Sequence, residues 1–597
     1  MKKLLFLTCL LGIGVFFTDC RTDPKPDTTT KVDFKHDENI VYARLRADAD
    51  NLNPYVATAA YAQEVYKHIL PYLMYFSPET LELTPILVKG KPEVKELTEG
   101  EYAGGISYTY EFLDEAQWDN GQTLTAEDVI FSFKVMFTNT WPNQRAKGSY
   151  SFVGDIQADE NNPKRFTFFV KNKYILSEVQ LSTITVLPSY IYDPNGILAN
   201  FSLQDIMNPD HKFSDAEMAQ LQQFGDNFMD SKYQREKGFV VGCGAYELEE
   251  WETGQRIILK KKENWWGDAL ADKYPMLQAE PQEIHYKIIA DQTSAVAALR
   301  DQELDAIDQI QPKDYINLSE DKRMQELYDF SAPARLVGSY VTFNLRNPKL
   351  EQKEVRRAIA HLFDIDNIME NVIDGMGKRI NNPIMLYIPD EKLHEQTPPI
   401  PFDVAKAKDL LTAAGWTDTD NNGIVDKEID GEVVELELTY LASSPTEEQI
   451  GLLFQNSAKE VGVSIVPIKK EFITKLGDVR KGEYELAAMA FRGYPMPYDP
   501  HQNFHSDNTR AGGSNFGGYI NEEVDELITQ IRVEMDDTKR RTLYARFLQI
   551  INEDQPYVYL FSPLNPTAIS KRFSAESSSM GYFTNMFELK SDVNMKN

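Results

Sequence analysis

The sequence predicts a mixed α/β protein of several domains, and three observations support this fold class. The chain has 597 residues, too many for one hydrophobic core, so two to four domains are expected. Alternation of apolar and polar residues indicates half-buried strands, as in ISYTYEF at 106–112. Capped segments with an apolar face indicate helices in the same chain. The hydrophobic content of 42% and charged content of 26% are ordinary for a globular protein.

The first residues predict an export signal. Lys2 and Lys3 precede an apolar stretch at 4–17, which is too short to span a bilayer comfortably and has no stop-transfer flank. The expected signal peptide is 1–19. No later segment approaches eighteen apolar residues, so we expect an exported, soluble body held at one end.

The signal ends at a cysteine, which predicts a lipid anchor. An apolar stretch that stops at Cys20 and continues as a polar, Pro- and Thr-rich tether at 20–38 resembles a bacterial lipoprotein signal. In that family cleavage precedes the Cys, which carries the lipid. Here Asp19 replaces the usual small residue and Phe17 the usual Leu, so ordinary signal cleavage nearby is the alternative.

Cysteine usage and charge narrow the class of protein. Cys9 would be lost with the signal and Cys20 acylated, which leaves Cys243 alone and excludes an intrachain disulfide. The formal net charge of −30 disfavours binding to nucleic acid and direct adhesion to anionic lipid. We find no Walker loop, zinc-protease helix or nucleophile elbow, and no base for Cys243, so an enzyme is not expected.

Local patterns predict individual elements in chain order. After the strand at 106–112, Asp119-Asn120-Gly121 is a turn signal and Thr125 with Asp128 forms a capping box for the following helix. RFTFFV at 165–170 is a strand. A two-stranded hairpin is expected around Thr253-Gly254, and a helix at 403–415 is expected to begin at Asp403 and end at Gly415.

An acidic loop at 418–426 could hold a cation. Asp418, Asp420, Asn422 and Asp426 match the early positions of an EF-hand loop, but Ile429 stands where the bidentate acid is expected. The alternatives are a weak structural Ca²⁺ site and an acidic turn rich in Asx hydrogen bonds. No other cofactor is expected.

The stretch MAFRGYPMPYDPHQNF at 489–504 allows two interpretations. A helix beginning near Pro500 would bring His501 and His505 to one face, which is a metal-ligand spacing, although two ligands do not complete a site. A proline-interrupted aromatic loop would instead form the wall of a ligand pocket.

Several blocks, taken in order, resemble the family 5 solute-binding proteins of ABC importers, the group of oligopeptide-, dipeptide- and nickel-binding proteins. The resemblance covers about residues 40–565. Its main blocks are NLNPY at 51–55, YTYEFLDEAQWDNGQTLTAEDVIFSF at 108–133, GCGAYELEEWETGQRIILKKKENWW at 242–266 and VTFNLRNPKLEQKEVRRAIAHLFDIDNIMENVIDGMG at 341–377.

This resemblance implies an α/β, two-lobed periplasmic-binding-protein type II fold with three domains, of the cluster C kind, whose hinged cleft closes on a ligand. It implies a monomer that delivers its ligand to an ABC permease in the membrane. The segments expected on this basis are the signal peptide 1–19, the tether 20–38, lobe I at 39–58, 183–285 and 551–597, the extra domain II at 59–182, and lobe II at 286–550.

The resemblance also implies the ligand-binding residues. Tyr494 and Tyr498 are expected as stacking walls, beside Phe491, with Asp499-Pro500 as the turn that fixes them. Peptide binders carry an aspartate just before this turn to hold the peptide's amino group. Here Arg492 stands in that region, which would repel an ammonium and favour an anion.

Further ligand contacts are expected from two of the matching blocks, at Asn344 and at Cys243-Gly244. Nickel-chelate binders share the aromatic wall, but their metal-contacting His lies in the following loop, where SDNTRAGGSNFGG has none. We therefore expect a binder of short peptides. The alternatives are a binder of a metallophore, haem or anionic small solute, and a sensory receptor without a transporter.

Overall fold

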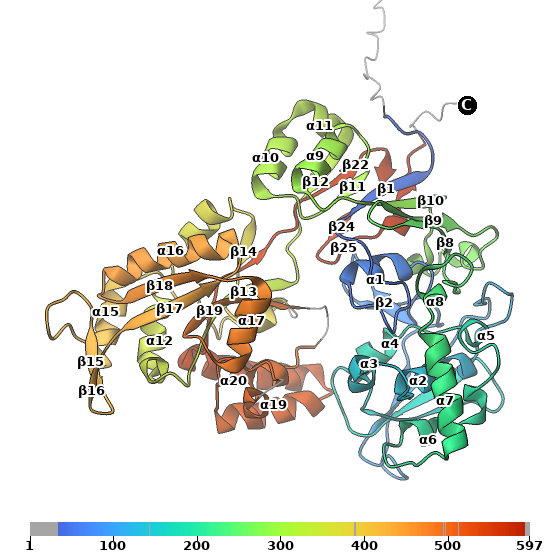
Figure 1. Ribbon diagram of the computed structural model, residues 1–597, viewed down its shortest axis with the longest axis horizontal. Coiled ribbons are helices and arrows are strands. Elements are labelled where there is room, and N and C mark those ends of the chain that lie inside the picture. The colour runs from blue at the N-terminus through green and yellow to red at the C-terminus, as the bar shows by residue number, and fades with distance from the viewer. Residues whose placement is uncertain are drawn as a thin grey trace, which may run out of the picture.

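The computed structural model describes residues 34–142, 144–386, 390–493, 495, 497–510 and 513–591. The predicted signal peptide, Cys20 and Tyr494 lie outside the described residues. Three sheets organise the rest into two lobes and an extra domain (Figure 1). Within the described ranges, no helix has both the length and the apolar character needed to cross a bilayer.

Lobe I is built on a seven-stranded sheet whose central strands run parallel. Its order is β12 (Tyr328–Ser331), β22 (Thr567–Ser570), β11 (Ala306–Ile307), β1 (Ile40–Leu45), β10 (Glu283–Ile288), β9 (Arg256–Lys261) and β8 (Tyr246–Glu252). The predicted hairpin is confirmed, since β8 and β9 pair around Gly254, whose φ of 74° suits glycine. The remaining elements here are α9 (Gln292–Arg300), α10 (Pro312–Glu320), α11 (Lys322–Leu327), β23 (Phe573–Ser574), β24 (Ser577–Ser578), β25 (Gly581–Tyr582) and β26 (Glu588–Leu589).

Domain II contains a four-stranded antiparallel sheet covered by helix α2 (Ala126–Phe137). The predicted strand at 106–112 is confirmed: Ile106, Tyr108 and Tyr110 are buried on its inner face. The Thr125 amide donates to the Asp128 carboxylate at 2.8 Å, as the predicted capping box requires. The sheet order is β4 (Glu93–Glu96), β5 (Ile106–Glu111), β7 (Arg165–Val170) and β6 (Val153–Ala158).

Shorter elements complete this part of the chain. They are α1 (Ala60–Tyr66), β2 (Met74–Phe76), β3 (Leu83–Pro85), α3 (Gln144–Ser149), α4 (Ser177–Ser182), α5 (Ser189–Tyr192), α6 (Leu203–Met207), α7 (Asp215–Phe228) and α8 (Lys232–Arg235). One continuous apolar core runs from the lobe I sheet into domain II. The two therefore pack as a single unit, on the right of Figure 1.

Lobe II holds a five-stranded sheet with helices on both faces (Figure 1). Its order is β18 (Ser464–Lys469), β17 (Glu437–Ala442), β19 (Leu486–Arg492), β13 (Val337–Phe343) and β20 (Tyr557–Tyr559). Helices α12 (Lys353–Ala360), α15 (Val404–Ala413) and α16 (Pro445–Lys459) bury one core, while α19 (Glu522–Val533) and α20 (Asp537–Asp554) bury another. The predicted Asp403 cap is confirmed, because its carboxylate accepts the Lys406 amide at 2.8 Å.

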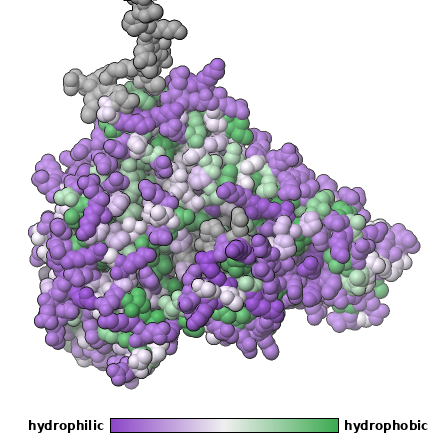
Figure 2. All heavy atoms as spheres, turned by 180° about the vertical axis from the view of Figure 1, so that it is seen from behind, coloured by the Kyte–Doolittle hydropathy of each residue, from purple (hydrophilic) through white to green (hydrophobic). Residues whose placement is uncertain are grey.

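The other elements of lobe II are short. They are α13 (Ile365–Asn367), β14 (Gly377–Arg379), α14 (Glu391–His394), β15 (Asp426–Ile429), β16 (Glu432–Glu435), α17 (Phe472–Lys481), α18 (His501–Phe504) and β21 (Phe561–Pro563). Seen from behind, the surface is mostly hydrophilic and its apolar residues form small separate patches (Figure 2). This agrees with the strongly negative net charge of −30.

The chain crosses between the lobes twice, and the two crossing segments hydrogen-bond to each other. The Arg335 amide donates to the Pro563 carbonyl at 2.9 Å, and the Asn565 amide donates to the Pro333 carbonyl at 2.7 Å. The Ser562 hydroxyl adds a bond of 2.6 Å to the Arg335 carbonyl. This paired strip, at 332–336 and 562–566, is the hinge between the lobes.

Three predicted boundaries are wrong. Lobe II was expected from 286, but β11 and β12 pair with β22 in the lobe I sheet, so lobe II begins at the first crossing. It was expected to end at 550, but β20 pairs with β13. The segment after 183 was expected in lobe I, yet its Leu198 and Leu221 carbonyls accept Lys134 and Thr140 from domain II.

The end of the predicted tether is also fastened, at 34–38. Buried Arg572 donates to the Glu38 carbonyl at 2.7 Å and forms a two-armed salt bridge with Asp305, each arm 2.6 Å long. The Lys35 amide donates to Gln302 at 3.1 Å. The described chain therefore enters and leaves the protein beside the same lobe I strands (Figure 1).

Replacing Arg572 by Met should destabilise the protein strongly, because it leaves the Asp305 carboxylate buried without its partner. Breaking such a pair costs about 3–5 kcal/mol. Urea unfolding followed by circular dichroism measures the loss. Arg546→Met, which removes an exposed pair with Glu523, is the matched control and should change the stability by less than about 1 kcal/mol. Equal losses in both variants would contradict the assignment.

Candidate functional site

Four charged residues lie close together where the lobe I sheet and the lobe II sheet face the hinge. Two come from lobe I, one from the hinge and one from lobe II. Arg46 directly follows β1, Asp308 directly follows β11, and Arg492 is the last residue of β19. Arg335 lies on the first crossing segment, two residues before β13, whose first residue pairs with Arg492. In open α/β sheets, ligands bind outside the carboxyl ends of parallel strands. The topology therefore places this cluster where a ligand is expected.

The cluster is positive. The pKa of Arg335 is lowered by partial burial, with Asp308 opposing the shift and the nearby Arg492 and Arg46 adding to it. Arg46 donates to Gln309 at 2.8 Å. Within the part of the chain that the structure describes, the Arg335 guanidinium has no hydrogen-bond or ion-pair partner, although it is partly buried. Like charges held this close repel each other, and an anionic ligand would relieve that repulsion.

Asp308 is the acid of the cluster. Burial raises its pKa, and Glu64 adds to the rise, while Gln309, Arg335 and Arg46 act in the opposite direction. The carboxylate is therefore costly to ionise in this place, and a ligand ammonium would stabilise it. Positive and negative groups side by side suit a zwitterion.

An aromatic wall stands next to the cluster on lobe II. Phe491 precedes Arg492, and its ring lies 5.5 Å from that of Tyr340, which lies 5.0 Å from Tyr557. The Tyr559 hydroxyl is buried and has no hydrogen-bond partner in the described part of the chain. The wall comprises Tyr340, Phe491, Tyr498, Phe504, Tyr557 and Tyr559.

Tyr498, predicted as a stacking residue, lies in this wall but is covered by it. Its ring is 2% exposed, and the Tyr544 hydroxyl donates to its carbonyl at 2.6 Å. The space left between the wall residues is about 10 Å³, which is room for one water. In this conformation Phe491, which is half-buried, offers more ring surface than Tyr498. Ligand contact by either ring stays a prediction.

The structure places Asp499 as a bridge. One carboxylate oxygen accepts the His501 amide at 3.0 Å, which forms the expected turn. The other accepts Arg532 at 3.0 Å and the Tyr174 hydroxyl at 3.2 Å. Tyr174 belongs to domain II, so Asp499 connects the aromatic wall to another domain.

His501 and His505 do come together, with Asp507 as a third group of metal-ligand type. Their rings lie 4.6 Å apart. However, His505 Nδ1 accepts the Asp507 amide at 3.1 Å, and His501 Nδ1 lies 3.1 Å from the Asn508 amide nitrogen. The Asp507 carboxylate also pairs with Arg510. The protein itself engages these groups, and we assign no metal to them.

Asn344 lies at the other end of its strand from the position paired with Arg492, and ligand contact by Asn344 stays a prediction. Asn344 follows the carboxyl end of β13, whereas Arg492 pairs with its first residue, Val337, so the length of the strand, about 20 Å, separates them. The Asn344 amide donates to the Gly482 and Tyr484 carbonyls at 3.0 and 2.9 Å. Its role is to fix the loop before β19.

Cys243 and Gly244 also lie away from the cluster, in the core that joins lobe I to domain II. Burial raises the pKa of the Cys243 thiol to about 12, and its carbonyl accepts both the Trp265 and Trp266 indoles. A Cβ on Gly244 would lie 2.2 Å from the His68 carbonyl oxygen. These residues serve close packing in the core, and ligand contact there stays a prediction.

The acidic loop is folded by its own carboxylates. Asp418, Asp420 and Asp426 converge, and Asp418 accepts the Asn422 and Gly423 amides at 3.1 and 3.0 Å. Asp426 accepts the Thr419 amide and hydroxyl. These are the hydrogen bonds of an acidic turn, and Ca²⁺ binding there stays a prediction.

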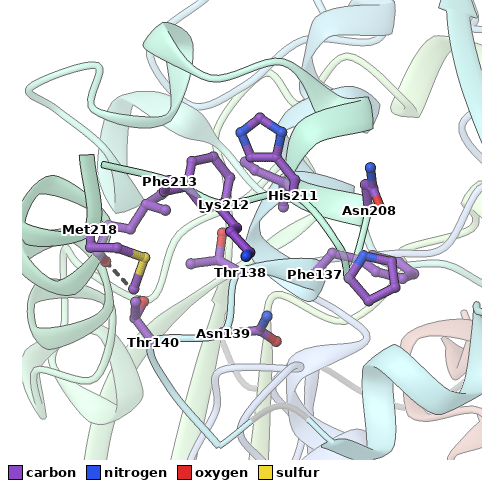
Figure 3. Close-up of a pocket in the computed structure, with 12 residues that line it drawn as sticks. Phe137, Thr138, Asn139, Thr140, Asn208, His211, Lys212, Phe213 and Met218 are labelled. Carbon is purple, nitrogen blue, oxygen red and sulfur yellow. Dashed lines mark hydrogen bonds between the residues drawn. The ribbon is translucent and has the colours of Figure 1, made fainter. Parts of the chain in front are cut away.

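A separate cavity of about 400 Å³ lies within domain II (Figure 3). Phe137, Phe213 and Met218 supply apolar surface, while His211 and Lys212 stand at its side. His211 lies 3.2 Å from Asp205. All of its lining comes from one domain, so this cavity is not part of the site between the lobes.

The fold and the charged edge define a two-lobed binding protein with a hinge. Over residues 94–515 the chain matches the model of the bacterial extracellular solute-binding proteins, family 5 Middle. The chain belongs to this family.

Known relatives agree with the fold. The oligopeptide-binding protein AppA of Bacillus subtilis is 22% identical over 578 residues, which cover 95% of this chain and 94% of AppA. The structure of AppA in complex with a nonapeptide matches with a TM-score of 0.64 at 21% identity, over 92% of this chain and 99% of that one. NikA from Brucella suis, in complex with Fe(III)-EDTA, matches with a TM-score of 0.70 at 18% identity, over 92% and 100%.

Of the cluster, the sequence pointed only to Arg492. Arg46, Arg335 and Asp308 were missed because they come from three distant segments. A usable signal was present at 40–46, where the strand IVYARL at 40–45 is followed directly by the charged residue Arg46.

Replacing Arg335 by Gln should weaken the binding of a ligand that presents a carboxylate. The loss of one charge-assisted hydrogen bond corresponds to about 1.5–3 kcal/mol, or roughly 10- to 100-fold in affinity. Calorimetric titration with tri-alanine and with its C-terminal amide checks this. The variant should lose affinity for the acid and change little for the amide. An equal loss for both would contradict a carboxylate contact.

Proposed function

We propose that this protein captures short peptides between its lobes and delivers them to the permease of an ABC importer. The observation that carries this proposal is the cluster of Arg46, Arg335 and Arg492 with Asp308, beside the aromatic wall. The arginines would hold the peptide carboxylate, and Asp308 its ammonium. Backbone hydrogen bonds and aromatic contacts would hold the remainder of the peptide, with little selectivity for its amino-acid sequence.

The protein would act as a monomer outside the cytoplasmic membrane, held by a lipid on Cys20. A clamp delivered to a permease needs no catalysis of its own, because the importer's ATPase supplies the energy. Mass spectrometry of the N-terminal peptide of the exported protein would identify the acyl group on Cys20. An N-terminus without lipid would remove the anchor from this proposal and leave peptide binding untouched.

A library of peptides from two to six residues tests the ligand class. The protein is first unfolded and refolded to remove any ligand acquired during expression. Calorimetric titration should then detect binding by some library members, with affinity lost when the peptide carboxylate is amidated. Absence of heat from the whole library, with a correctly refolded protein, would contradict peptide binding.

A second candidate is a metallophore, haem or anionic small solute. It is favoured by Arg492, which lies in the region where peptide binders carry the aspartate for the amino group, and by the similar structure of NikA in complex with Fe(III)-EDTA. Such a ligand would use the arginines and gain nothing from Asp308. Mass spectrometry of ligand carried through native purification separates the two candidates directly.

The variant Asp308→Asn distinguishes peptide ligands from purely anionic ligands through its effects on stability and on binding affinity. Since the folded pKa of Asp308 is raised, its ionised form costs stability at neutral pH. This cost decreases as the pH falls below the folded pKa and is gone below the unfolded pKa. The variant should therefore be at least as stable as the parent at pH 7 by thermal unfolding. Free-amino peptides should bind it more weakly, whereas a purely anionic ligand should bind it more tightly. Weaker binding of anionic ligands would contradict this assignment of Asp308.

A further inference from the structure

Domain II contacts lobe II through the loop before α4. The loop before α4 brings Tyr174 to the Asp499 carboxylate, at 3.2 Å from its hydroxyl. Arg532, near the end of α19, donates to the same oxygen at 3.0 Å and lies over the Tyr174 ring at 5.2 Å. In Figure 1 the hinge lies above the region between the lobes, and the ends of α4 and α19 lie below it.

Backbone and apolar contacts reinforce this contact. The Ile175 amide donates to the Arg532 carbonyl at 2.9 Å. The Ile175 side chain is 4% exposed and packs within the lobe II core, although its chain belongs to domain II. Met535 packs against both that core and the core of lobe I and domain II. The contact therefore joins two separately folded cores.

The polar part is partly shielded from water. The Asp499 side chain is 10% exposed and that of Arg532 is 35% exposed. Burial raises the pKa of Tyr174 to about 12, with the Asp499 charge adding to the rise, so the hydroxyl keeps its proton and donates. The Asp499 carboxylate accepts one hydrogen bond from a charged guanidinium and one from a hydroxyl. Both bonds depend on geometry, so they form only when domain II and lobe II are in this relative position.

We propose that Tyr174, Asp499 and Arg532 form a latch that holds the clamp closed from the side opposite the hinge. The latch is attached to the aromatic wall, because Asp499 directly follows Tyr498, whose ring packs in the wall and whose carbonyl accepts the Tyr544 hydroxyl at 2.6 Å. The three latch residues are positioning residues: they act through the wall and through the separation of the lobes.

With the latch, the closed arrangement of the lobes depends on two connections, the hinge and the latch. With the hinge alone, lobe II could swing away from lobe I and domain II. With the latch formed, entry to and exit from the space between the lobes require the Asp499 contacts to break first. Ligand exchange is then governed by the opening of the latch.

Amide hydrogen exchange and small-angle X-ray scattering test the latch without any ligand. In the parent protein the Ile175 amide should be protected. In Arg532→Ala and in Asp499→Asn its exchange should be at least tenfold faster, and the radius of gyration should increase. Arg546→Ala, in the neighbouring helix, removes an exposed pair with Glu523 and should change neither quantity.

Tyr174→Phe isolates the hydroxyl, since the ring under Arg532 remains. It should speed Ile175 exchange by less than Arg532→Ala does. Protection of the β19 amides must stay at the parent level in each variant, which shows that lobe II is still folded. Unchanged exchange at Ile175 and an unchanged radius in both Asp499→Asn and Arg532→Ala would overturn the latch. So would an Ile175 amide that exchanges as fast as an exposed loop in the parent.

A kinetic arm rests on the proposed peptide-binding function. Stopped-flow fluorescence with tri-alanine should show association and dissociation accelerated together in Arg532→Ala, each at least fivefold, with a smaller change in their ratio. No signal in any variant would count against tri-alanine as a ligand and leave the exchange and scattering results to decide on the latch. A signal with unchanged rates would overturn control of exchange by the latch.

Discussion

The pairing of the two crossing segments is the constraint on which the rest of the structure depends. Lobe II is one continuous insertion between β12 and β22, so only the strip at 332–336 and 562–566 connects it covalently to lobe I. Two backbone hydrogen bonds and the Ser562 hydroxyl keep the strip in register. If both crossings bend together, lobe II would move as one body without deformation of the sheets.

The strip also explains why the charged cluster exists. Arg335 lies within it, and the pairing of β13 with β19 sets Arg492 opposite Val337, just beyond it. Arg46 and Asp308 come from the lobe I side. An anion bound here would be held by the hinge and both lobes at once. The charge of a bound ligand would therefore act directly on the relative position of the lobes, with no intermediate residues needed to transmit its effect.

Much of the fold could be predicted from local pattern. The strands at 106–112 and 165–170, the hairpin around Gly254 and the helix after Asp403 depend on periodicity, turns and caps, and each lies where it was expected. Domain boundaries could not be predicted this way. The neighbours of β22 in the sheet are β12 and β11, more than two hundred residues away, and nothing local to 567–570 indicates which sheet it joins.

In the candidate site, too, local sequence pattern identified some residues, whereas others depend on long-range topology. Arg492 was found because it lies in a distinctive stretch, whereas Arg46 and Arg335 meet it only through crossings and sheet order. Asn344 lies just beyond the end of β13 that is opposite to Arg335 and Arg492, and its sequence motif did not indicate at which end it lies. Gly244 is fixed by its close approach to His68, and Cys243 by the indoles of Trp265 and Trp266. A motif alone does not distinguish such long-range packing from ligand contact.

The hydrogen bonds and salt bridge of Arg572 determine which lobe bears a force applied at the ends of the chain. It clamps the incoming chain at Glu38 to β11 through Asp305, and it lies just after β22 on the outgoing chain. Both ends of the described chain are thus anchored in lobe I, and none of lobe II lies near either terminus (Figure 1). A pull applied at either end is borne by lobe I and does not pass through the hinge. A molecule held by its terminus at a surface would keep lobe I stationary, and lobe II would do all of the moving.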